Sequence, residues 1–420
     1  MKAFLVFFIS LFITFLATAQ NDTTQKVIAG RKNSAGQQNK PYVILISADG
    51  FRYDYAEKYH AEHLLELAAL GVKAAAMEPS FPSVTFPNHY TIVTGLYPSH
   101  HGLVDNSFLD PARKQFYSMS DKAKVADGTW YGGTPLWVLA EQQQMLSASF
   151  YWVASEATIQ SQISTYYYIY NDKISIHNRI QAVVNWLNLP AGKRPHFITF
   201  YFPQVDHAGH VFGPDAPETK KEVLFVDSAV NELNKAVKAT GLNVDFIFVA
   251  DHGMTKIDKD NSIAKPAIID TSRFIISGDG VMVHLYAKDP KYIKDTYEQL
   301  KKEASGYQVY LTENMPEYLH YSKADDRFNR IGDILLIPDW PRVFNIYNRS
   351  KLNTGTHGYD PAVVKEMLAT FYAWGPDFKS HLEIPVFKNV EIYPVVTTIL
   401  GLNYTEKIDG TKKLAKKILK

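Results

Sequence analysis

Uninterrupted apolar runs recur through the first two thirds of the chain and alternate with segments of helical spacing. The apolar runs cover residues 42–47, 149–153, 196–202 and 244–250. Runs of this kind are typical of parallel strands that are buried on both faces. The segments with apolar residues every three to four positions cover 61–70, 180–187 and 218–240. The alternation predicts an α/β fold with a mostly parallel central sheet flanked by helices.

The pattern changes between residues 254 and 353. There the sequence predicts strands and one amphipathic helix of an inserted, smaller α+β lobe of βαβ type, at 281–287, 291–302, 308–311 and 333–337. A strand near 369–374 and a helix near 390–401 then return to the main sheet. We therefore expect a main domain built from 41–253 and 354–420, which ends in a basic tail or helix.

Three of the apolar runs lead directly into acidic residues and histidines. Asp49 follows the first run, Asp206 and His210 follow the third, and Asp251 and His252 follow the fourth. Ligands of open parallel sheets bind beyond the carboxyl ends of the strands. One aspartate at a strand end is an ordinary turn residue, but three such ends together predict a shared site.

The segment 80–102 contains a candidate nucleophile. Pro87 suits the first turn of a helix, and Gly95 suits the position that ends one. We expect a short helix over 86–94 with Thr85 at or near its N-cap. A hydroxyl there lies at the positive end of the helix dipole, beside N–H groups that can hold an anion. An isolated threonine in this position is most often only a cap.

Composition narrows the possible chemistry. The 420 residues are enough for a large core, and the formal net charge of +1 gives no reason to expect a nucleic-acid partner. There is no cysteine, which excludes disulfides, thiolate metal ligands and a cysteine nucleophile.

The first residues have the pattern of an export signal. Residues 1–19 contain a lysine, an apolar stretch and an Ala-Thr-Ala cleavage site, which predicts a signal peptide cut before Gln20. Residues 20–40 are polar and are interpreted as a linker. A periplasmic or secreted location follows, with no stable membrane span after cleavage. The alternative is an uncleaved anchor.

The candidate ligands form a nitrogen and oxygen set. They are Asp49, Asp206, His210, Asp251, His252 and His357. Such a set suits two Zn²⁺ ions, with Mn²⁺ also possible. A structural zinc would use four protein ligands, so six candidates beside Thr85 favour an open catalytic site. Two metals about 4 Å apart can clamp the attacking and leaving oxygens at phosphorus. A threonine hydroxyl needs such activation, because it is otherwise a weak nucleophile.

Together these motifs resemble the nucleotide pyrophosphatase/phosphodiesterases of the alkaline phosphatase superfamily. The resemblance extends from Val43 to about Tyr404. It rests on Asp49-Gly50, Thr85-Phe86-Pro87-Asn88-His89-Tyr90, Gly95-Leu96-Tyr97-Pro98, His101-Gly102, Asp206, Gly209-His210, Asp251-His252-Gly253 and His357-Gly358-Tyr359. It implies an alkaline-phosphatase-like fold and an exported, zinc-dependent hydrolase of nucleotide phosphodiester or phosphoanhydride bonds.

The resemblance also implies a role for each site residue. It assigns one zinc to Asp206, His210 and His357, and the second to Asp49, Asp251, His252 and the Thr85 oxygen. Thr85 would attack phosphorus and form a phospho-threonine that water hydrolyses. Asn106 would donate to a non-bridging phosphate oxygen, where charge lies in the transition state. Phe86 and Tyr201 would sandwich the base of a small nucleotide diester or polyphosphate.

Other interpretations stay open at this point. A phosphomonoesterase of this type adds a Lys/Arg pair that holds the dianionic phosphate, and Lys173 and Arg179 are candidates for it. A diesterase for lipid head groups such as glycerophosphocholine is a second alternative. A metal- or phosphate-binding protein without turnover is a third, although such a protein has no need of Thr85.

Overall fold

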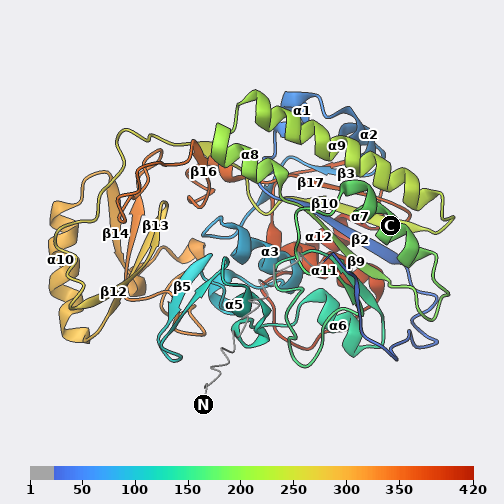
Figure 1. Cartoon of the computed structure of the whole chain (residues 1–420), viewed down its shortest axis with the longest axis horizontal. Coiled ribbons are helices and arrows are strands. Elements are labelled where there is room, and N and C mark those ends of the chain that lie inside the picture. Colours follow the sequence, from blue (N-terminus) through green and yellow to red (C-terminus); the bar gives the residue numbers. More distant parts are fainter. Residues whose placement is uncertain (1–22) are drawn as a thin grey trace, which may run out of the picture.

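The computed structural model describes residues 23–420, so the predicted signal peptide lies outside the described residues. Figure 1 shows a larger domain, in which a central sheet lies between two layers of helices, and a smaller lobe beside it that ends in α10 (Ile293–Glu303). No helix within residues 23–420 combines the length and apolar character needed to cross a bilayer.

The central sheet has nine strands, and its middle is parallel. In spatial order they are β1 (Lys26–Val27), β8 (Tyr166–Tyr167), β7 (Ser147–Phe150), β9 (Phe197–Phe202), β2 (Tyr42–Ala48), β10 (Val244–Val249), β17 (Phe371–Trp374), β3 (Val72–Ala74) and β18 (Leu382–Ile384). The strands from β8 to β10 pair in parallel, whereas β1 and β17 run antiparallel to their neighbours. Every residue of β2 is buried, which explains its uninterrupted apolar run. The predicted mostly parallel sheet is confirmed.

Helices cover both faces of this sheet (Figure 1). One layer contains α1 (Tyr55–Tyr59), α2 (Glu62–Leu70), α7 (Ile176–Leu187), α8 (Gln204–Phe212) and α9 (Pro217–Lys238). The other contains α3 (Thr85–Thr94), α6 (Leu136–Gln142), α11 (Ile392–Leu400) and α12 (Lys413–Ile418). The apolar residues at helical spacing in α9 are all buried: Val223, Val226, Val230, Leu233 and Val237. Their 3.6-residue period marks the face of the helix that packs toward the sheet.

The smaller lobe has a sheet and a core of its own. Its strand order is β12 (Phe274–Asp279), β13 (Met282–Ala287), β15 (Ile334–Pro338) and β14 (Tyr307–Leu311), and every neighbouring pair is antiparallel. β13 and β14 are therefore parallel to each other with β15 between them, and α10 connects them. This is a βαβ unit split by a third strand, and all of it falls within 254–353.

One segment is more structured than the sequence indicated, and the basic end adopts the helical form of its two predicted alternatives. The described part of the predicted linker, 23–40, forms β1 on the central sheet, and Asn33 is buried with hydrogen bonds to Ala191, Arg194 and Leu146. The linker interpretation is therefore wrong for these residues, since polar composition does not exclude strand pairing. The basic end forms α12, whose apolar side packs on α11.

Candidate active site

The carboxyl ends of three neighbouring strands meet at one edge of the central sheet. The register pairs Ser47 of β2 with Tyr201 of β9 on one side and with Val249 of β10 on the other. The three strands therefore end level. Asp49 comes directly after β2, Asp251 is the second residue after β10, and both are buried.

A glycine brings the third aspartate close. Gly50 has a φ of +68°, and a Cβ at this position would lie 2.8 Å from the Cα of Asp206. Glycine permits both the backbone conformation and the approach. The N–H of Asp206 donates to the carbonyl of Asp49 (3.0 Å), so the start of α8 is fixed against the end of β2. His210 follows Asp206 by one helical turn, on an α8 that the sequence analysis missed.

Thr85 opens α3 as its first helical residue, with Val84 in the N-cap position. Val84 has no side-chain group that could cap the helix, and the Thr85 hydroxyl lies 3.1 Å from Nε2 of His252. The capping acceptor comes instead from Asn106, whose Oδ1 accepts the N–H of Phe86 (2.9 Å). A backbone N–H can only donate, so Nδ2 is the group that Asn106 offers to the cleft that it lines. The predicted N-cap is thus displaced by one residue, and the hydroxyl stays available for chemistry.

Three histidines present the same nitrogen to the centre of the site. The Nδ1 atoms of His210, His252 and His357 lie 2.9–3.0 Å from the carbonyls of Gly355, Gly253 and Ser83 respectively. An N–H that donates to a carbonyl fixes the tautomer and leaves Nε2 with its lone pair, which is the usual arrangement of metal-binding histidines.

One group of ligand atoms has the spacing of a metal site. Oδ1 of Asp206 lies 3.4 Å from Nε2 of His210 and 3.5 Å from Nε2 of His357. The two Nε2 atoms lie 3.1 Å apart. Ligands about 2.1 Å from a tetrahedral zinc are separated by about 3.4 Å. Two Nε2 lone pairs also repel each other unless a cation lies between them, so this group fits a metal.

A second group surrounds Nε2 of His252. This atom lies 3.0 Å from Oδ2 of Asp251, 3.5 Å from Oδ1 of Asp49 and 3.1 Å from the Thr85 hydroxyl. The predicted ligands of both metals are thereby brought together. His89 is a neighbour that the sequence analysis left without a role: its Nδ1 lies 3.2 Å from Oδ2 of Asp251 and 3.0 Å from the Thr85 carbonyl.

Buried charge without a partner supports the same interpretation. One carboxylate oxygen each of Asp49, Asp206 and Asp251 is buried without a hydrogen-bond partner. Burial and the charges of Asp251 and Asp206 raise the pKa of Asp49 well above its usual value. Burial and the neighbouring His252 and His210 lower the pKa of His357 well below its usual value. Cations placed among these groups would lower the pKa of Asp49 again and would keep His357 neutral, which is the form that binds a metal. The donor set fits zinc and does not exclude manganese.

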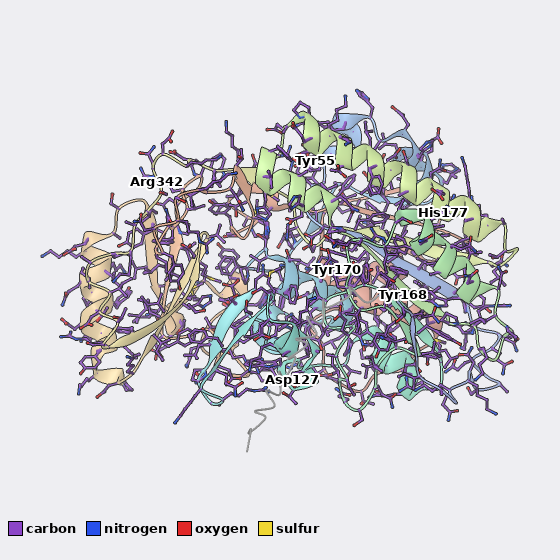
Figure 2. The ribbon with its side chains drawn as sticks, in the orientation of Figure 1. Tyr55, Asp127, Tyr168, Tyr170, His177 and Arg342 are labelled. Carbon is purple, nitrogen blue, oxygen red and sulfur yellow. The ribbon has the colours of Figure 1, made fainter. Side chains whose placement is uncertain are left out.

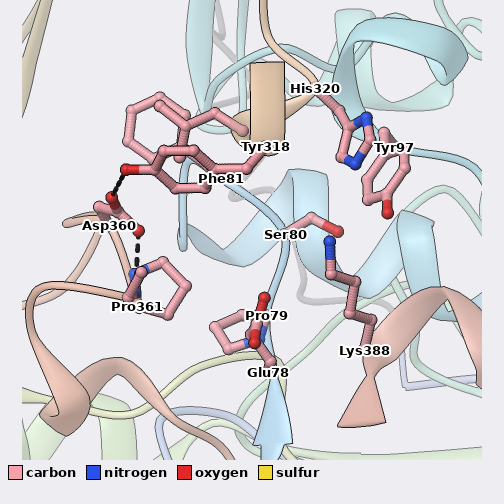
Figure 3. A pocket seen from close by; sticks show the side chains of 12 residues that line it. Glu78, Pro79, Ser80, Phe81, Tyr97, Tyr318, His320, Asp360, Pro361 and Lys388 are labelled. Atoms are coloured by element: carbon pink, nitrogen blue, oxygen red, sulfur yellow. Dashed lines mark hydrogen bonds between the residues drawn. The ribbon is translucent and has the colours of Figure 1, made fainter. Parts of the chain in front are cut away.

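A cleft of about 730 Å³ opens from this site toward the smaller lobe. His210, His357 and Asn106 line its inner end, and Phe116, Tyr347 and Arg349 are among its outer residues. This volume lies within the range of small-molecule sites. The hollow shown in Figure 3, between Tyr97, Tyr318 and Lys388, has a volume of only about 30 Å³, enough for a water molecule. The large cleft is therefore the substrate candidate.

The predicted stacking residues differ in what their side chains do. Phe86 is half-buried and packs against Tyr117. The hydroxyl of Tyr201 donates to Oδ2 of Asp49 (2.6 Å), so this tyrosine also orients a candidate metal ligand. Tyr170, labelled in Figure 2, is 44% exposed, and its ring centroid lies 6.2 Å from that of Tyr201. It is an aromatic surface beside the site that no sequence motif indicated.

Comparison with known sequences agrees with this geometry. Residues 43–360 match the family model described as type I phosphodiesterase / nucleotide pyrophosphatase. The chain is 33% identical over 376 residues to the mouse ectonucleotide pyrophosphatase/phosphodiesterase family member 1, which covers 86% of this chain and 41% of the mouse protein. It is 34% identical over 396 residues to an uncharacterized pyrophosphatase/phosphodiesterase of Schizosaccharomyces pombe, covering 90% of this chain and 80% of the other. The chain belongs to the nucleotide pyrophosphatase/phosphodiesterase family.

Solved structures show the same fold. Human ectonucleotide pyrophosphatase/phosphodiesterase 5 aligns with a TM-score of 0.83 and 27% identity, over 90% of this chain and 99% of that one. An inactive variant of the murine protein, in which a threonine is replaced by alanine, was solved in complex with AMP and aligns with a TM-score of 0.83 and 28% identity, over 91% and 100%. The predicted fold class is confirmed. The chain spans about 41% of the length of the first mammalian relatives, which are larger proteins.

Proposed function

We propose that this protein is a zinc-dependent phosphodiesterase and nucleotide pyrophosphatase that works through a phospho-threonine. The observation that carries the proposal is the Thr85 hydroxyl at the start of α3, 3.1 Å from Nε2 of His252. The proposal needs both parts of the site, because the hydroxyl is a weak nucleophile without metals and the metals alone would support only a binding role. The AMP complex of the inactive murine relative supports both the threonine and a nucleotide ligand.

Each residue has a part in the proposed reaction. Thr85 attacks phosphorus, the leaving alcohol or phosphate departs on the opposite side, and water then cleaves the phospho-threonine. The Nδ2 group of Asn106 donates to a non-bridging oxygen as charge develops on it. The positive end of the α3 dipole favours the same anion.

Two zinc ions fit the ligand set. Asp206, His210 and His357 would hold one, and Asp49, Asp251 and His252 would hold the other beside Thr85. When bound, they would lower the pKa of the attacking hydroxyl and neutralise charge at phosphorus. The carbonyls that accept from Nδ1, and the Tyr201 hydroxyl on Asp49, keep these ligands oriented.

The shape of the site favours diesters over monoesters. The cleft continues well beyond the reacting centre and leaves room for a second ester substituent. Arg179, the candidate holder of a dianionic phosphate, is buried and donates to the Tyr201 carbonyl (3.0 Å). Phe86 with Tyr170 or Tyr201 offers ring faces for a base, and such stacking tolerates different bases.

Export to the periplasm or the medium is part of the proposal. It rests on the signal-like pattern of residues 1–19. Relatives such as the venom phosphodiesterase of Macrovipera lebetinus, 33% identical over 380 residues, carry names that agree with a location outside the cell.

The test compares three chromogenic substrates with the zinc-loaded protein. We expect kcat/KM for a nucleoside 5′-p-nitrophenyl phosphodiester to exceed that for p-nitrophenyl phosphate by orders of magnitude, since kcat/KM measures transition-state binding. A preference for p-nitrophenyl phosphate would favour the phosphomonoesterase. A preference for p-nitrophenyl phosphocholine would favour the head-group diesterase, and two bound metals without turnover would favour a binding protein.

A further inference from the structure

The segment that carries Asn106 is held on two sides. Within the main domain, β5 (Ser107–Asp110) pairs with β6 (Gln115–Ser118), and the Met119 N–H donates to the Asn106 carbonyl (2.9 Å). The smaller lobe holds it from the other side. Five side chains of 277–330 bind successive positions of 104–110: Tyr321 to the Val104 carbonyl (2.6 Å), His284 to Asp105 (3.2 Å), Ser277 to the Ser107 carbonyl (3.2 Å), Tyr286 to the Leu109 N–H (3.2 Å) and Arg330 to Asp110 (2.9 Å). The residue proposed to donate to phosphate therefore lies on a segment that the smaller lobe helps to hold.

His284 is the contact nearest to Asn106. It lies on β13 and its side chain is completely buried. Nδ1 lies 2.8 Å from the Ile331 carbonyl, and Nε2 lies 3.2 Å from Oδ2 of Asp105. Both ring nitrogens therefore face oxygen atoms, and the contact of Nε2 with Oδ2 fixes the orientation of the Asp105 side chain.

The path continues from Asp105 to the nucleophile. Oδ1 of Asp105 accepts the backbone N–H of Asn106 (2.6 Å). Oδ1 of Asn106 in turn accepts the N–H of Phe86 (2.9 Å), the residue after Thr85. These bonds fix both the backbone and the amide plane of Asn106. Four residues thus connect the core of the lobe with the first turn of α3.

We propose that His284 is a positioning residue, which acts through Asp105 to hold the Asn106 amide at the angle at which it meets a phosphate oxygen. The inference rests on the proposed function. It gives the smaller lobe a part in the reaction without requiring it to contact the substrate. Asn106 itself remains the residue that touches the reacting group.

The expected losses of activity can be compared with typical losses in other enzymes. Loss of one donor at a developing oxyanion lowers kcat by about 10²–10³-fold. Loss of a residue that orients such a group typically costs about 10–100-fold. For His284→Phe, which keeps a ring in the buried space, we expect kcat on the nucleoside p-nitrophenyl diester to fall about 10–100-fold. KM should change by less than about 3-fold, because the donor matters most in the transition state.

A double-mutant cycle distinguishes positioning from general loosening. If His284 acts through Asn106, the double variant His284→Phe/Asn106→Ala should be no more than about 3-fold slower than Asn106→Ala alone. Fully multiplicative losses would overturn the inference. The matched control is Tyr286→Phe, because Tyr286 lies two residues away on β13 and also bridges to this segment, at Leu109. It should keep kcat/KM within about 3-fold, and an equal loss there would also overturn the inference.

A second pair of variants covers the case in which His284→Phe does not fold. Asp105→Asn keeps an acceptor for the Asn106 N–H and a polar group within reach of Nε2 of His284. It should therefore lose at least about 5-fold less activity than Asp105→Ala, which keeps neither bond. Equal losses would contradict the path.

Failure of the proposed function is recognised separately. A wild-type protein that does not hydrolyse the diester removes that proposal alone, because the same cycle can be measured without turnover as the affinity for orthovanadate, which mimics the transition state at phosphorus. His284→Phe and Asn106→Ala should then weaken orthovanadate binding non-additively. Additive effects on orthovanadate binding would overturn the positioning role.

Discussion

Thr85 is the side chain on which the proposed chemistry depends most directly. Its hydroxyl lies near Nε2 of His252. Thr85→Ala should lower kcat/KM on the nucleoside diester by at least about 10³-fold, since it removes the hydroxyl proposed to form the covalent bond to phosphorus. Thr85→Ser keeps the hydroxyl and should retain a measurable part of the rate.

Acid quenching of the reaction with a ³²P-labelled diester provides the direct measurement. Labelled protein should be trapped with wild type and with Thr85→Ser and should be absent with Thr85→Ala, although zinc content is unchanged. Turnover of Thr85→Ala close to that of the wild type would exclude Thr85 as the nucleophile.

His357 tests the metal assignment at the same scale. Its Nε2 lies within 3.5 Å of ligand atoms of Asp206 and His210, and a metal held by three protein ligands is weakened strongly when one is lost. His357→Ala should reduce zinc measured by elemental analysis from two ions to about one. His207→Ala is the control, because His207 lies on α8 beside the site but is exposed. Two zinc ions retained by His357→Ala would refute this assignment.

At the scale of the element, the start of α3 depends on one buried amide. Asn88 accepts from the N–H of Ser80 (2.8 Å) and donates to the carbonyls of Pro82 (2.8 Å) and Val84 (3.0 Å). It also accepts from Asn389 (2.8 Å). The side chain thereby folds the chain before Thr85 back onto the helix that follows it. A proline-rich segment gains from this anchor the fixed geometry that a nucleophile requires.

Asn88→Ala should lower the free energy of unfolding by about 2–4 kcal/mol, because it leaves several buried polar groups without partners. Urea unfolding followed by circular dichroism measures the change. The control Asn185→Ala, on the exposed side of α7, should change stability by less than about 0.5 kcal/mol. A loss of similar size in both variants would show that the hydrogen bonds of Asn88 do not contribute to the free energy of unfolding beyond what an exposed residue does.

Elements of this protein were predictable where one physical rule dominated. β2 was evident because burial on both faces requires an apolar run, and α9 because burial of one face imposes a 3.6-residue period. α8 was missed because Pro203 and a sequence rich in polar ligands obscured its period. β1 was missed because it has only two residues, Lys26 and Val27, which pair through backbone bonds and leave no apolar run in the sequence.

At the scale of the whole molecule, the site was predictable as a set of residues but not as a network. Aspartates and histidines after strands converge because parallel strands end level, and that rule needs no coordinates. The orientation of each side chain depends on partners distant in sequence, such as Gly355 for His210 and Phe86 for Asn106. His284 and Tyr170 belong to no motif, so only the folded chain brings them to the site.

The two ends of β10 carry aspartates with different roles. Asp251 follows its carboxyl end in the active site, whereas Asp245, near its amino end, is buried beside Asp377. Burial and the charge of Asp377 raise the pKa of Asp245 from 3.8 to about 7, although the Asp377 N–H and Lys420 act in the opposite direction. The ionised form is therefore disfavoured in the folded chain, and Asp245 makes stability depend on pH at a place remote from the catalytic groups.

The sign follows from which state keeps the proton. Below about pH 4, Asp245 is protonated in both states and has no effect on the balance. Between about pH 4 and 7 the unfolded chain loses a proton that the folded chain keeps, so stability falls as pH rises. Asp245→Asn keeps the acceptor for the Asp377 N–H and removes the ionisation. At pH 8 the variant should exceed the wild type by about 2–4 kcal/mol in urea unfolding, with the gap closing toward pH 4. kcat/KM should stay unchanged, and a gap independent of pH would contradict the raised pKa.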